Sequence, residues 1–353
     1  MNQIRFTKLT YVLLLFVLVA CQAQATSVST TAPPLATAIP ATVTLTATPA
    51  LTAKPSAAPV IAEWKVSNPS FIAFGFGSVW VTDHYGHNIT RIDPVSNKVI
   101  AVIQGTGSNP EQALEVGDVL WVTGQSNDTV LIDPATNTVI KTLAGPHLFM
   151  AYGFNSVWIT TRDNKLDRFD PATTEIIASI PVNEGVCDCM NDVLVTAEAV
   201  WVISCDKAEL IKVDPLTNSV VSKTPYATLI NEATAQTQVP AGKGTDFIWI
   251  SLLGDEGGQG RPRGLLRVSP ITDTGLTFLP LSPAQAGDCC IAVSDKAVWL
   301  SGSGQINRVN VATNQIDATY STASGRLKIG VGLGSVWLRN YVKNLIQRLD
   351  VAP

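Results

Sequence analysis

Charged side chains are scarce in this 353-residue chain, where Asp, Glu, Lys and Arg together make up 15% of the residues. The formal net charge is −4, and no segment concentrates lysine or arginine. A surface that binds the phosphate backbone of nucleic acids needs a basic patch, so we exclude nucleic acid as a partner. Apolar residues reach 46%, which is enough to build the core of one large all-β domain or of two average domains.

Histidine is equally sparse, since the chain has only His84, His87 and His147. No Ser-His-Asp order, HExxH pattern or phosphate-binding loop occurs. The fragment 254–258 lacks the alternating acidic ligands of a calcium loop. A metal held by Asp83, His84 and His87 from one loop is an alternative, but an exposed neutral histidine needs no such explanation. We therefore predict no catalytic residue, no metal and no cofactor.

The first 20 residues have the order of a secretion signal. Arg5 and Lys8 precede an uncharged apolar run, 11–20, that is too short to span a bilayer. The run ends Leu-Val-Ala-Cys at Cys21, which resembles the lipobox of bacterial lipoproteins, whose cysteine is lipidated and becomes the new N-terminus. The resemblance implies lipidation of Cys21 and a membrane anchor. An ordinary cleaved signal peptide and an uncleaved anchor are the alternatives.

Residues 21–59 consist mainly of Thr, Ala, Pro and Ser, and Lys54 is their only charged residue. Without aromatic residues or apolar periodicity, such a segment buries too little surface to fold. We predict a disordered tether that holds the following domain off a membrane. Together with the signal, it predicts export across the cytoplasmic membrane and a lipid anchor at the extracytoplasmic face of a bacterial cell envelope.

A repeat built around tryptophan covers the rest of the chain. Each tryptophan has an apolar residue on either side, and successive tryptophans are 41, 37, 43, 48, 50 and 38 residues apart. The seven are Trp80, Trp121, Trp158, Trp201, Trp249, Trp299 and Trp337. A period near 40 with short strands is typical of β-propeller blades of four strands each. We expect each tryptophan to fill the gap between neighbouring blades.

The first copy shows the expected strands of a blade. An apolar segment, 71–76, is predicted to be the innermost strand and to form a hairpin with the tryptophan strand. The third strand, 89–92, and the fourth, 98–103, are joined by Asp93-Pro94-Val95-Ser96-Asn97. Proline suits a type I turn, Asp can accept a hydrogen bond from the backbone ahead of it, and Asn tolerates the left-handed conformation that closes the hairpin.

The last copy ends after its third strand, at 349–353, and therefore lacks a fourth. The segment 60–64 resembles the fourth strand of the first copy, and the segment 67–69 after it matches 108–110. We expect this N-terminal strand to complete the last blade, so that the chain ends join and the ring has no open edge between blades. The prediction is a monomeric all-β protein in which residues 60–353 form a seven-bladed β-propeller of four-stranded blades.

At this level of detail, residues 60–353 resemble the YVTN/YncE-like repeat propellers and, more distantly, the streptogramin (virginiamycin B) lyases. The resemblance implies the propeller fold and says little of activity. In the lyases, as a family, catalytic His and Glu residues with a divalent metal lie in the later blades. The later blades here contain no histidine, which argues against that activity.

Beyond Cys21, the chain has Cys187, Cys189, Cys205, Cys289 and Cys290. The first two strands of the fourth copy are expected to form a hairpin that turns at 197–198. Residues that face each other across this hairpin then have numbers that add up to about 394 or 395. Cys189 and Cys205 add up to 394. We therefore predict a disulfide between these two, as export permits. For Cys187, Cys289 and Cys290, three states remain open. They are a vicinal bridge between Cys289 and Cys290, a bridge from one of these two to Cys187, and free thiols. A zinc site is a weaker reading because the ligand spacing is absent.

Propellers bind ligands mainly at the mouth of the central channel, where the connections into the innermost strands meet the loops after the tryptophan strands. The polar residues that we expect there are candidate ligand-binding residues. They are His84, Tyr85, Glu111, His147, Arg162, Asp163, Glu256, Asp288, Arg326, Arg339 and Tyr341. Their charges have both signs, so the set alone indicates no single class of charged ligand.

These observations favour a membrane-anchored, non-catalytic module that binds a small molecule, a glycan or an envelope protein. The alternative is a lyase-like or other hydrolytic enzyme at the channel mouth, using His84, His147 and Glu111, with or without a metal. A third interpretation is a structural part of an envelope assembly.

Overall fold

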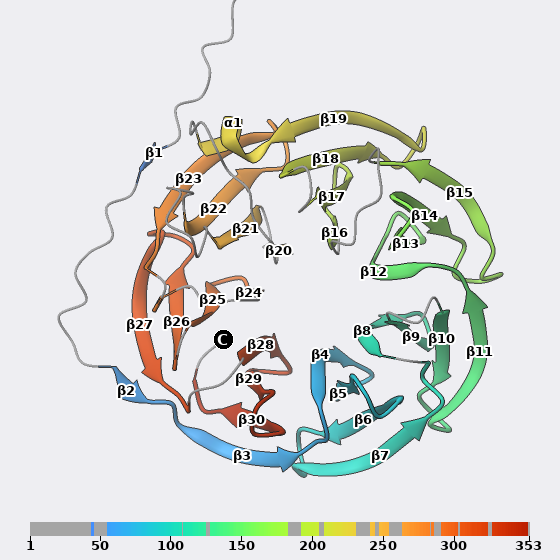
Figure 1. Cartoon of the computed structure of the whole chain (residues 1–353), viewed down its shortest axis with the longest axis vertical. Coiled ribbons are helices and arrows are strands. Elements are labelled where there is room, and N and C mark those ends of the chain that lie inside the picture. Colours follow the sequence, from blue (N-terminus) through green and yellow to red (C-terminus); the bar gives the residue numbers. More distant parts are fainter. Residues whose placement is uncertain are drawn as a thin grey trace, which may run out of the picture. The chain divides into compact units, whose positions relative to one another are not determined.

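Seven sheets stand in a ring in the computed structural model of the protein (Figure 1). The residues that the structure describes are 44–45, 55–107, 109–124, 128–182, 192–204, 208–230, 241–243, 247–253, 263–282, 284–285, 291–302, 304–323 and 327–351. Residues 41–353 belong to one compact unit. The seven-bladed propeller is confirmed, and blades are numbered here in the order of their tryptophans.

Each blade has four antiparallel strands, counted from the channel outward. Blade one comprises β4 (Pro69–Gly75), β5 (Ser78–Asp83), β6 (Asn88–Asp93) and β7 (Lys98–Gln104). Blade two comprises β8 (Pro110–Val116), β9 (Val119–Gly124), β10 (Asp128–Asp133) and β11 (Thr138–Ala144). Blade three comprises β12 (His147–Gly153), β13 (Ser156–Thr161), β14 (Lys165–Phe169) and β15 (Ile176–Pro181). Blade four comprises β16 (Asp192–Val195), β17 (Val200–Ser204), β18 (Glu209–Asp214) and β19 (Ser219–Pro225).

The remaining blades repeat this order. Blade five comprises β20 (Ala241–Lys243), β21 (Ile248–Leu253), β22 (Arg263–Ser269) and β23 (Thr274–Pro280). Blade six comprises β24 (Ile291–Val293), β25 (Ala297–Gly302), β26 (Gln305–Asn310) and β27 (Gln315–Ser321). Blade seven comprises β28 (Leu327–Gly332), β29 (Ser335–Asn340), β30 (Leu345–Leu349) and β3 (Val60–Lys65).

Blade seven closes the ring as predicted. Strand β3 pairs antiparallel with β30, from Val60 opposite Leu349 to Lys65 opposite Leu345. The ring of Trp64 stacks on that of Trp337 with centroids 5.5 Å apart. The first strand of the domain and the last strand of the chain therefore share one sheet, and no blade edge is left open between blades seven and one.

Three short elements lie outside the repeat. Strand β1 (Thr44–Leu45) pairs in parallel with β23, and β2 (Ser56–Ala57) pairs in parallel with β27. Each therefore adds two residues to the outer edge of a blade. Helix α1 (Tyr226–Ile230) follows β19, and its Tyr226 is fully buried among side chains of blades four and five. Within the described residues, no helix is long and apolar enough to cross a membrane.

The tryptophans pack between blades, as expected. All seven are buried to 2% exposure or less. Trp80, for example, lies in a cluster with Ala113 and Leu120 of the next blade. Because each apolar cluster draws side chains from two blades, burial of this surface holds the ring together as well as each sheet.

The Asp-Pro turns also have the expected geometry. The Asp93 carboxylate accepts a hydrogen bond from the Val95 amide at 2.8 Å, and Asn97 has a φ of 55°. The equivalent Asp133 and Asn137 of blade two behave in the same way, with 2.8 Å and 56°. Asparagine closes these hairpins because it tolerates the left-handed region better than most residues.

A contact that we name the inter-blade clamp joins neighbouring blades. The Arg91 guanidinium lies 4.7 Å from the Trp80 ring centroid, and its Nη1 donates to Asn137 Oδ1 in the turn of the next blade at 2.8 Å. Arg168 and Asn218 form the same contact between blades three and four at 2.9 Å. The turn asparagine thus has two functions, because it closes its own hairpin and binds the preceding blade.

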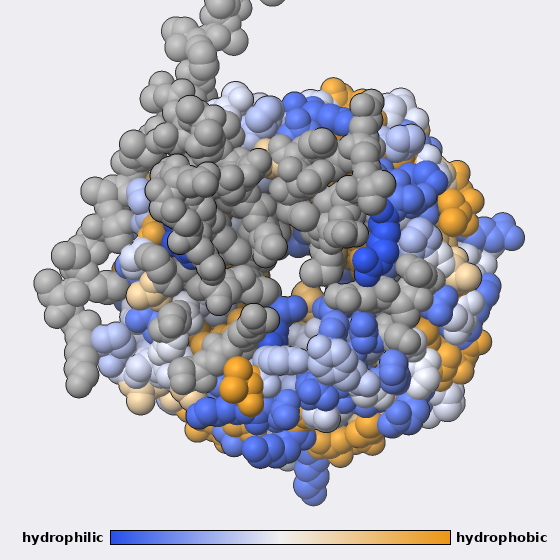
Figure 2. Space-filling model, in the orientation of Figure 1, coloured by the Kyte–Doolittle hydropathy of each residue, from blue (hydrophilic) through white to orange (hydrophobic). Residues whose placement is uncertain are grey.

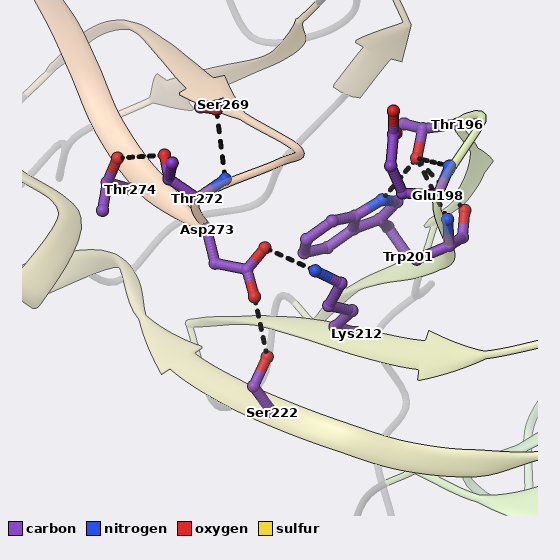
Figure 3. A network of polar contacts seen from close by, with 10 residues as sticks. Thr196, Glu198, Trp201, Lys212, Ser222, Ser269, Thr272, Asp273 and Thr274 are labelled. Atoms are coloured by element: carbon purple, nitrogen blue, oxygen red, sulfur yellow. Dashed lines mark hydrogen bonds and ion pairs between the residues drawn. The ribbon is translucent and has the colours of Figure 1, made fainter.

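Between blades four and five the clamp uses different side chains (Figure 3). Lys212 lies over Trp201 at 5.0 Å and donates to Asp273 at 2.8 Å, where other blades pair Arg with Asn. Asp273 also accepts a hydrogen bond from Ser222 at 3.4 Å. In blade six, the equivalent Arg308 pairs with Asp317 of its own blade. The Arg-Asn clamp therefore extends from blades one, three, five and seven. Blade four replaces it with Lys-Asp, Arg308 of blade six pairs within its own blade, and blade two has Leu131 at the equivalent position opposite Trp121.

Candidate functional site

The innermost strands of blades one to three share an irregularity near their first residues. The pairing register shifts after Pro69 in β4, after Pro110 in β8 and after His147 in β12. Such bulges re-aim side chains and are frequent beside binding sites. Ser70 and Glu111 lie within two of these bulges.

Glu111 is a buried carboxylate with polar partners from blade one. It is 6% exposed, and Ser70 Oγ donates to its Oε2 at 2.9 Å. His84 Nδ1, in the turn after β5, lies 2.9 Å from Glu111 Oε1, within the distance of an ion pair when the imidazole is protonated. The Tyr85 ring meets the His84 ring edge-on at 4.6 Å. The structure thus brings together three candidates, His84, Tyr85 and Glu111.

Blade seven adds Lys328, which lies close enough to feel the charge of Glu111, and Arg339 beside Lys328. Lys328 of β28 lies directly opposite Arg339 of β29 in the antiparallel pair, so both side chains leave the same face of the sheet. Arg339 is 6% exposed and lies 5.6 Å from the ring centroid of Tyr341. Lys328 Nζ lies 3.4 Å from the ring centroid of Phe71 in blade one. We call Ser70, His84, Glu111, Lys328 and Arg339 the channel cluster.

Lys328 has the most perturbed ionisation in the cluster. Its side chain keeps some contact with solvent, but surrounding strands remove enough hydration from the ammonium to lower its pKa to about 7. The carboxylate of Glu111 acts to raise this pKa, and the charge of Arg339 acts to lower it further. Near neutral pH, the amine is therefore divided between its charged and neutral forms.

The ring of Phe71, which Lys328 faces, also contacts an aromatic side chain of blade three. Phe71 of blade one meets Phe149 of blade three with centroids 6.0 Å apart. Strands β28, β4 and β8 lie side by side in the lower part of the ring (Figure 1). Figure 2 shows an opening at the centre of the ring with hydrophilic residues at its lower rim.

The candidates of blade three form a separate group. His147 is 1% exposed, and its Nδ1 lies 2.8 Å from Thr129 Oγ1. Burial lowers the pKa of His147, against the opposing effect of nearby aspartates. Arg162 is half-buried, and the exposed Asp163 accepts hydrogen bonds from Thr161 and Lys165. His147, Arg162 and Asp163 all come from blade three, whereas the channel cluster draws on blades one, two and seven.

Several predicted residues lie outside the described residues. These are Glu256, Asp288 and Arg326 at the predicted mouth, the lipidation site Cys21, and Cys187, Cys189, Cys205, Cys289 and Cys290. In blade four, β16 and β17 pair with residue numbers that sum to 395, as in Asp192 opposite Ile203. This agrees with the predicted turn, and the disulfide between Cys189 and Cys205 stays a prediction.

Among the residues that the structure describes, no three His, Cys, Asp or Glu side chains lie close enough to hold a metal ion. Asp83, which was a potential ligand beside His84, accepts hydrogen bonds from the amides of Tyr85 and Gly86 at 3.1 and 2.7 Å. Its carboxylate therefore shapes the turn after β5.

Sequence reasoning missed Lys328 and Ser70. Lys328 is the only charged residue in β28, whose other members are Leu, Ile, Val and Gly. In blades one and three, the corresponding channel-facing positions near the start of the innermost strand hold Phe71 and Phe149. Blades two and four have Gln112 and Asp192 at this position, so an alignment of the innermost strands would not have singled out Lys328.

No protein-family model and no curated protein matches the chain at the level of sequence. Several solved structures match its fold. One is hydrazine synthase of Kuenenia stuttgartiensis, with a TM-score of 0.67 and 13% identity over 83% of this chain and 98% of that one. Virginiamycin B lyase of Staphylococcus aureus has a TM-score of 0.67 and 15% identity over 82% and 98%. The protein shares their propeller fold. The Pan2 WD40 domain of Neurospora crassa, at 0.61 and 12% identity over 83% and 97%, shares it too. These three neighbours are a synthase, a lyase and a WD40 domain, so the structural similarity indicates a common fold and no common activity.

Proposed function

We propose that this protein is a binding module, anchored by lipid at the outer face of a bacterial cytoplasmic membrane or elsewhere in the envelope, that takes a small anionic ligand in the channel cluster. The observation that carries the proposal is the convergence of Lys328 and Arg339 from blade seven on the Ser70, His84 and Glu111 group. With Lys328 protonated, two cations face one carboxylate, before any charge on His84 is counted. A carboxylate or phosphate group would balance this excess.

Binding of small anions tests the site directly. Calorimetric titration of the purified domain with acetate, malonate, phosphate and sulfate should find at least one that binds, with an affinity that increases as the pH falls from 8 to 6. Lys328→Met and Arg339→Gln should each weaken binding about tenfold or more, as expected when a charged hydrogen bond is lost. Lys343→Met, at an exposed position of the same blade, is the matched control and should bind as the wild type does. Equal binding by all three folded variants would place the ligand elsewhere.

The anchor is a separate part of the proposal and rests on the sequence around Cys21 and on the 21–59 segment. Metabolic labelling with a fatty acid should mark the wild type and leave Cys21→Ser unmarked. Cell fractionation should find the wild type with membranes. An unlabelled wild type, or a Cys21→Ser variant that stays labelled, would refute the lipid anchor. Neither result would bear on the proposed binding site.

A second candidate function is a lyase or hydrolase, and the pairing of His84 with Glu111 beside Lys328 favours it, since these groups can exchange protons. Turnover of cyclic peptide lactones or glycans that is lost in Glu111→Gln would establish it. Ligand binding without turnover across such a panel would favour the binding module.

A further inference from the structure

Lys328 has features that anion binding does not require. An ion-pairing lysine works best when it is fully charged, whereas this amine is largely shielded from water and lies opposite the charged Arg339. Loss of hydration and a neighbouring cation are the two conditions under which a lysine becomes a nucleophile near neutral pH. Lys165, by contrast, pairs with Asp163, and that partner raises its pKa. The environment of Lys328 therefore favours the neutral amine.

The neighbours of Lys328 include the groups that an amine addition needs. Glu111 carries its proton-accepting oxygens within reach of Ser70 and His84, each at 2.9 Å. A carboxyl group or imidazolium in this position can donate a proton to a departing hydroxyl and recover it from water. Arg339 offers a planar guanidinium, which suits a carboxylate better than a point charge does.

We propose that Lys328 condenses reversibly with the carbonyl group of a small oxo acid while Arg339 pairs with the carboxylate of the same molecule. This inference rests on the proposed function, because the anion site and the reactive amine are one cluster. The Nζ lone pair forms the bond to the carbonyl carbon, and the carbonyl oxygen takes up a proton. The resulting hydroxyl takes up a second proton and leaves as water as the C=N bond forms, and over the two steps the nitrogen gives up both of its protons. Amine and carbonyl thus give imine and water, without oxidant or reductant.

Reductive trapping of wild-type protein tests the proposal without depending on any variant. The protein is incubated at pH 7 with glyoxylate and cyanoborohydride, and the adduct is located by peptide mapping. Lys328 should be labelled at least about tenfold faster than Lys343, because an exposed lysine with the usual pKa of about 10.4 is almost completely protonated at pH 7. Equal labelling of the two lysines would overturn the inference.

Variants distinguish the parts of the proposal. Lys328→Arg loses the nucleophilic amine, so glyoxylate should form no adduct at this position, while Lys343 of the same variant should be labelled at the wild-type rate. Arg339→Gln should slow labelling by glyoxylate more than labelling by propionaldehyde, which has no carboxylate. Identical slowing of both would overturn the role of Arg339.

The failure of this inference differs from the failure of the proposed function. If the wild type binds acetate or phosphate through Arg339 and yet gives no adduct at Lys328, the imine is refuted and the anion site stands. If propionaldehyde labels Lys328 selectively but no anion binds, the anion site is refuted together with the oxo-acid specificity.

Discussion

Arg348 should be much more important for stability than Arg308, although both occupy the same position in successive blades. The inter-blade clamp of Arg348 reaches from blade seven to the turn of blade one, where its Nη1 donates to the Pro94 carbonyl and to Asn97 Oδ1. Its Nε donates to Ser335 Oγ at 2.8 Å. Arg308 instead pairs with Asp317 within blade six. We therefore expect Arg348→Ala to loosen the contact that closes the ring, and Arg308→Ala to leave inter-blade contacts intact.

The expected magnitudes follow from these contacts. A hydrogen bond to a charged group contributes about 1.5–3 kcal/mol when it is shielded, and less at the partly exposed turn of blade one. The guanidinium also lies 5.5 Å from the Trp337 ring centroid, a cation–π contact of about 0.5–1 kcal/mol at exposed sites. Allowing for rehydration, Arg348→Ala should lose about 2–4 kcal/mol of unfolding free energy. Arg308→Ala removes a surface ion pair and should lose about 0.2–1 kcal/mol.

Urea unfolding followed by both tryptophan fluorescence and circular dichroism measures these losses. Coincidence of the two probes is needed, because a domain of this size can unfold through intermediates. Asn97→Gly serves as the second partner, since glycine preserves the left-handed turn while removing the acceptor. The double variant with Arg348→Ala should show a coupling of about 0.5–3 kcal/mol. Equal destabilisation by the Arg348 and Arg308 substitutions, or zero coupling, would refute the clamp as a closing contact.

Three further predictions concern pH and packing. Lys328 has a folded pKa of about 7 against an ordinary 10.5. The unfolded chain therefore binds more protons between these values, and stability should rise with pH across this window by less than the limit of about 5 kcal/mol that the difference sets. Lys328→Met should flatten this rise in urea midpoints between pH 6.5 and 9.5, and an unchanged slope would contradict the assignment. His147 has a folded pKa below its ordinary 6.5, so stability should fall as pH drops below 6.5 in the wild type and less so in His147→Gln, as chemical unfolding at pH 7.5 and 5 would show. A Cβ at Gly153 would lie 2.3 Å from Val195 Cγ1 of the next blade, so Gly153→Ala should destabilise by about 1–3 kcal/mol in the same assay, with partial recovery on adding Val195→Ala if the clash is the cause.

The channel cluster was only partly predictable from the sequence. His84, Glu111 and Arg339 could be proposed because polar residues in loops and at strand starts gather at a channel mouth. Lys328 was overlooked because a lysine within an apolar strand gives no local indication of the side it faces. The clamp escaped notice for a related reason, since Arg91 and Asn137 look like an exposed strand residue and a turn residue until two blades stand side by side.

Sequence alone determined the number of blades, the order of strands within them and the way in which 60–65 completes the last one. These properties follow from local patterns, because tryptophan spacing, alternation and Asp-Pro turns act within about 40 residues. Tertiary structure decided which side chains meet. Ser70, Glu111 and Lys328 belong to three blades and come together only because the ring closes. The pKa of Lys328 is a property of that closed ring, since burial lowers it, Glu111 of another blade opposes this effect, and Arg339 of the neighbouring strand lowers it further.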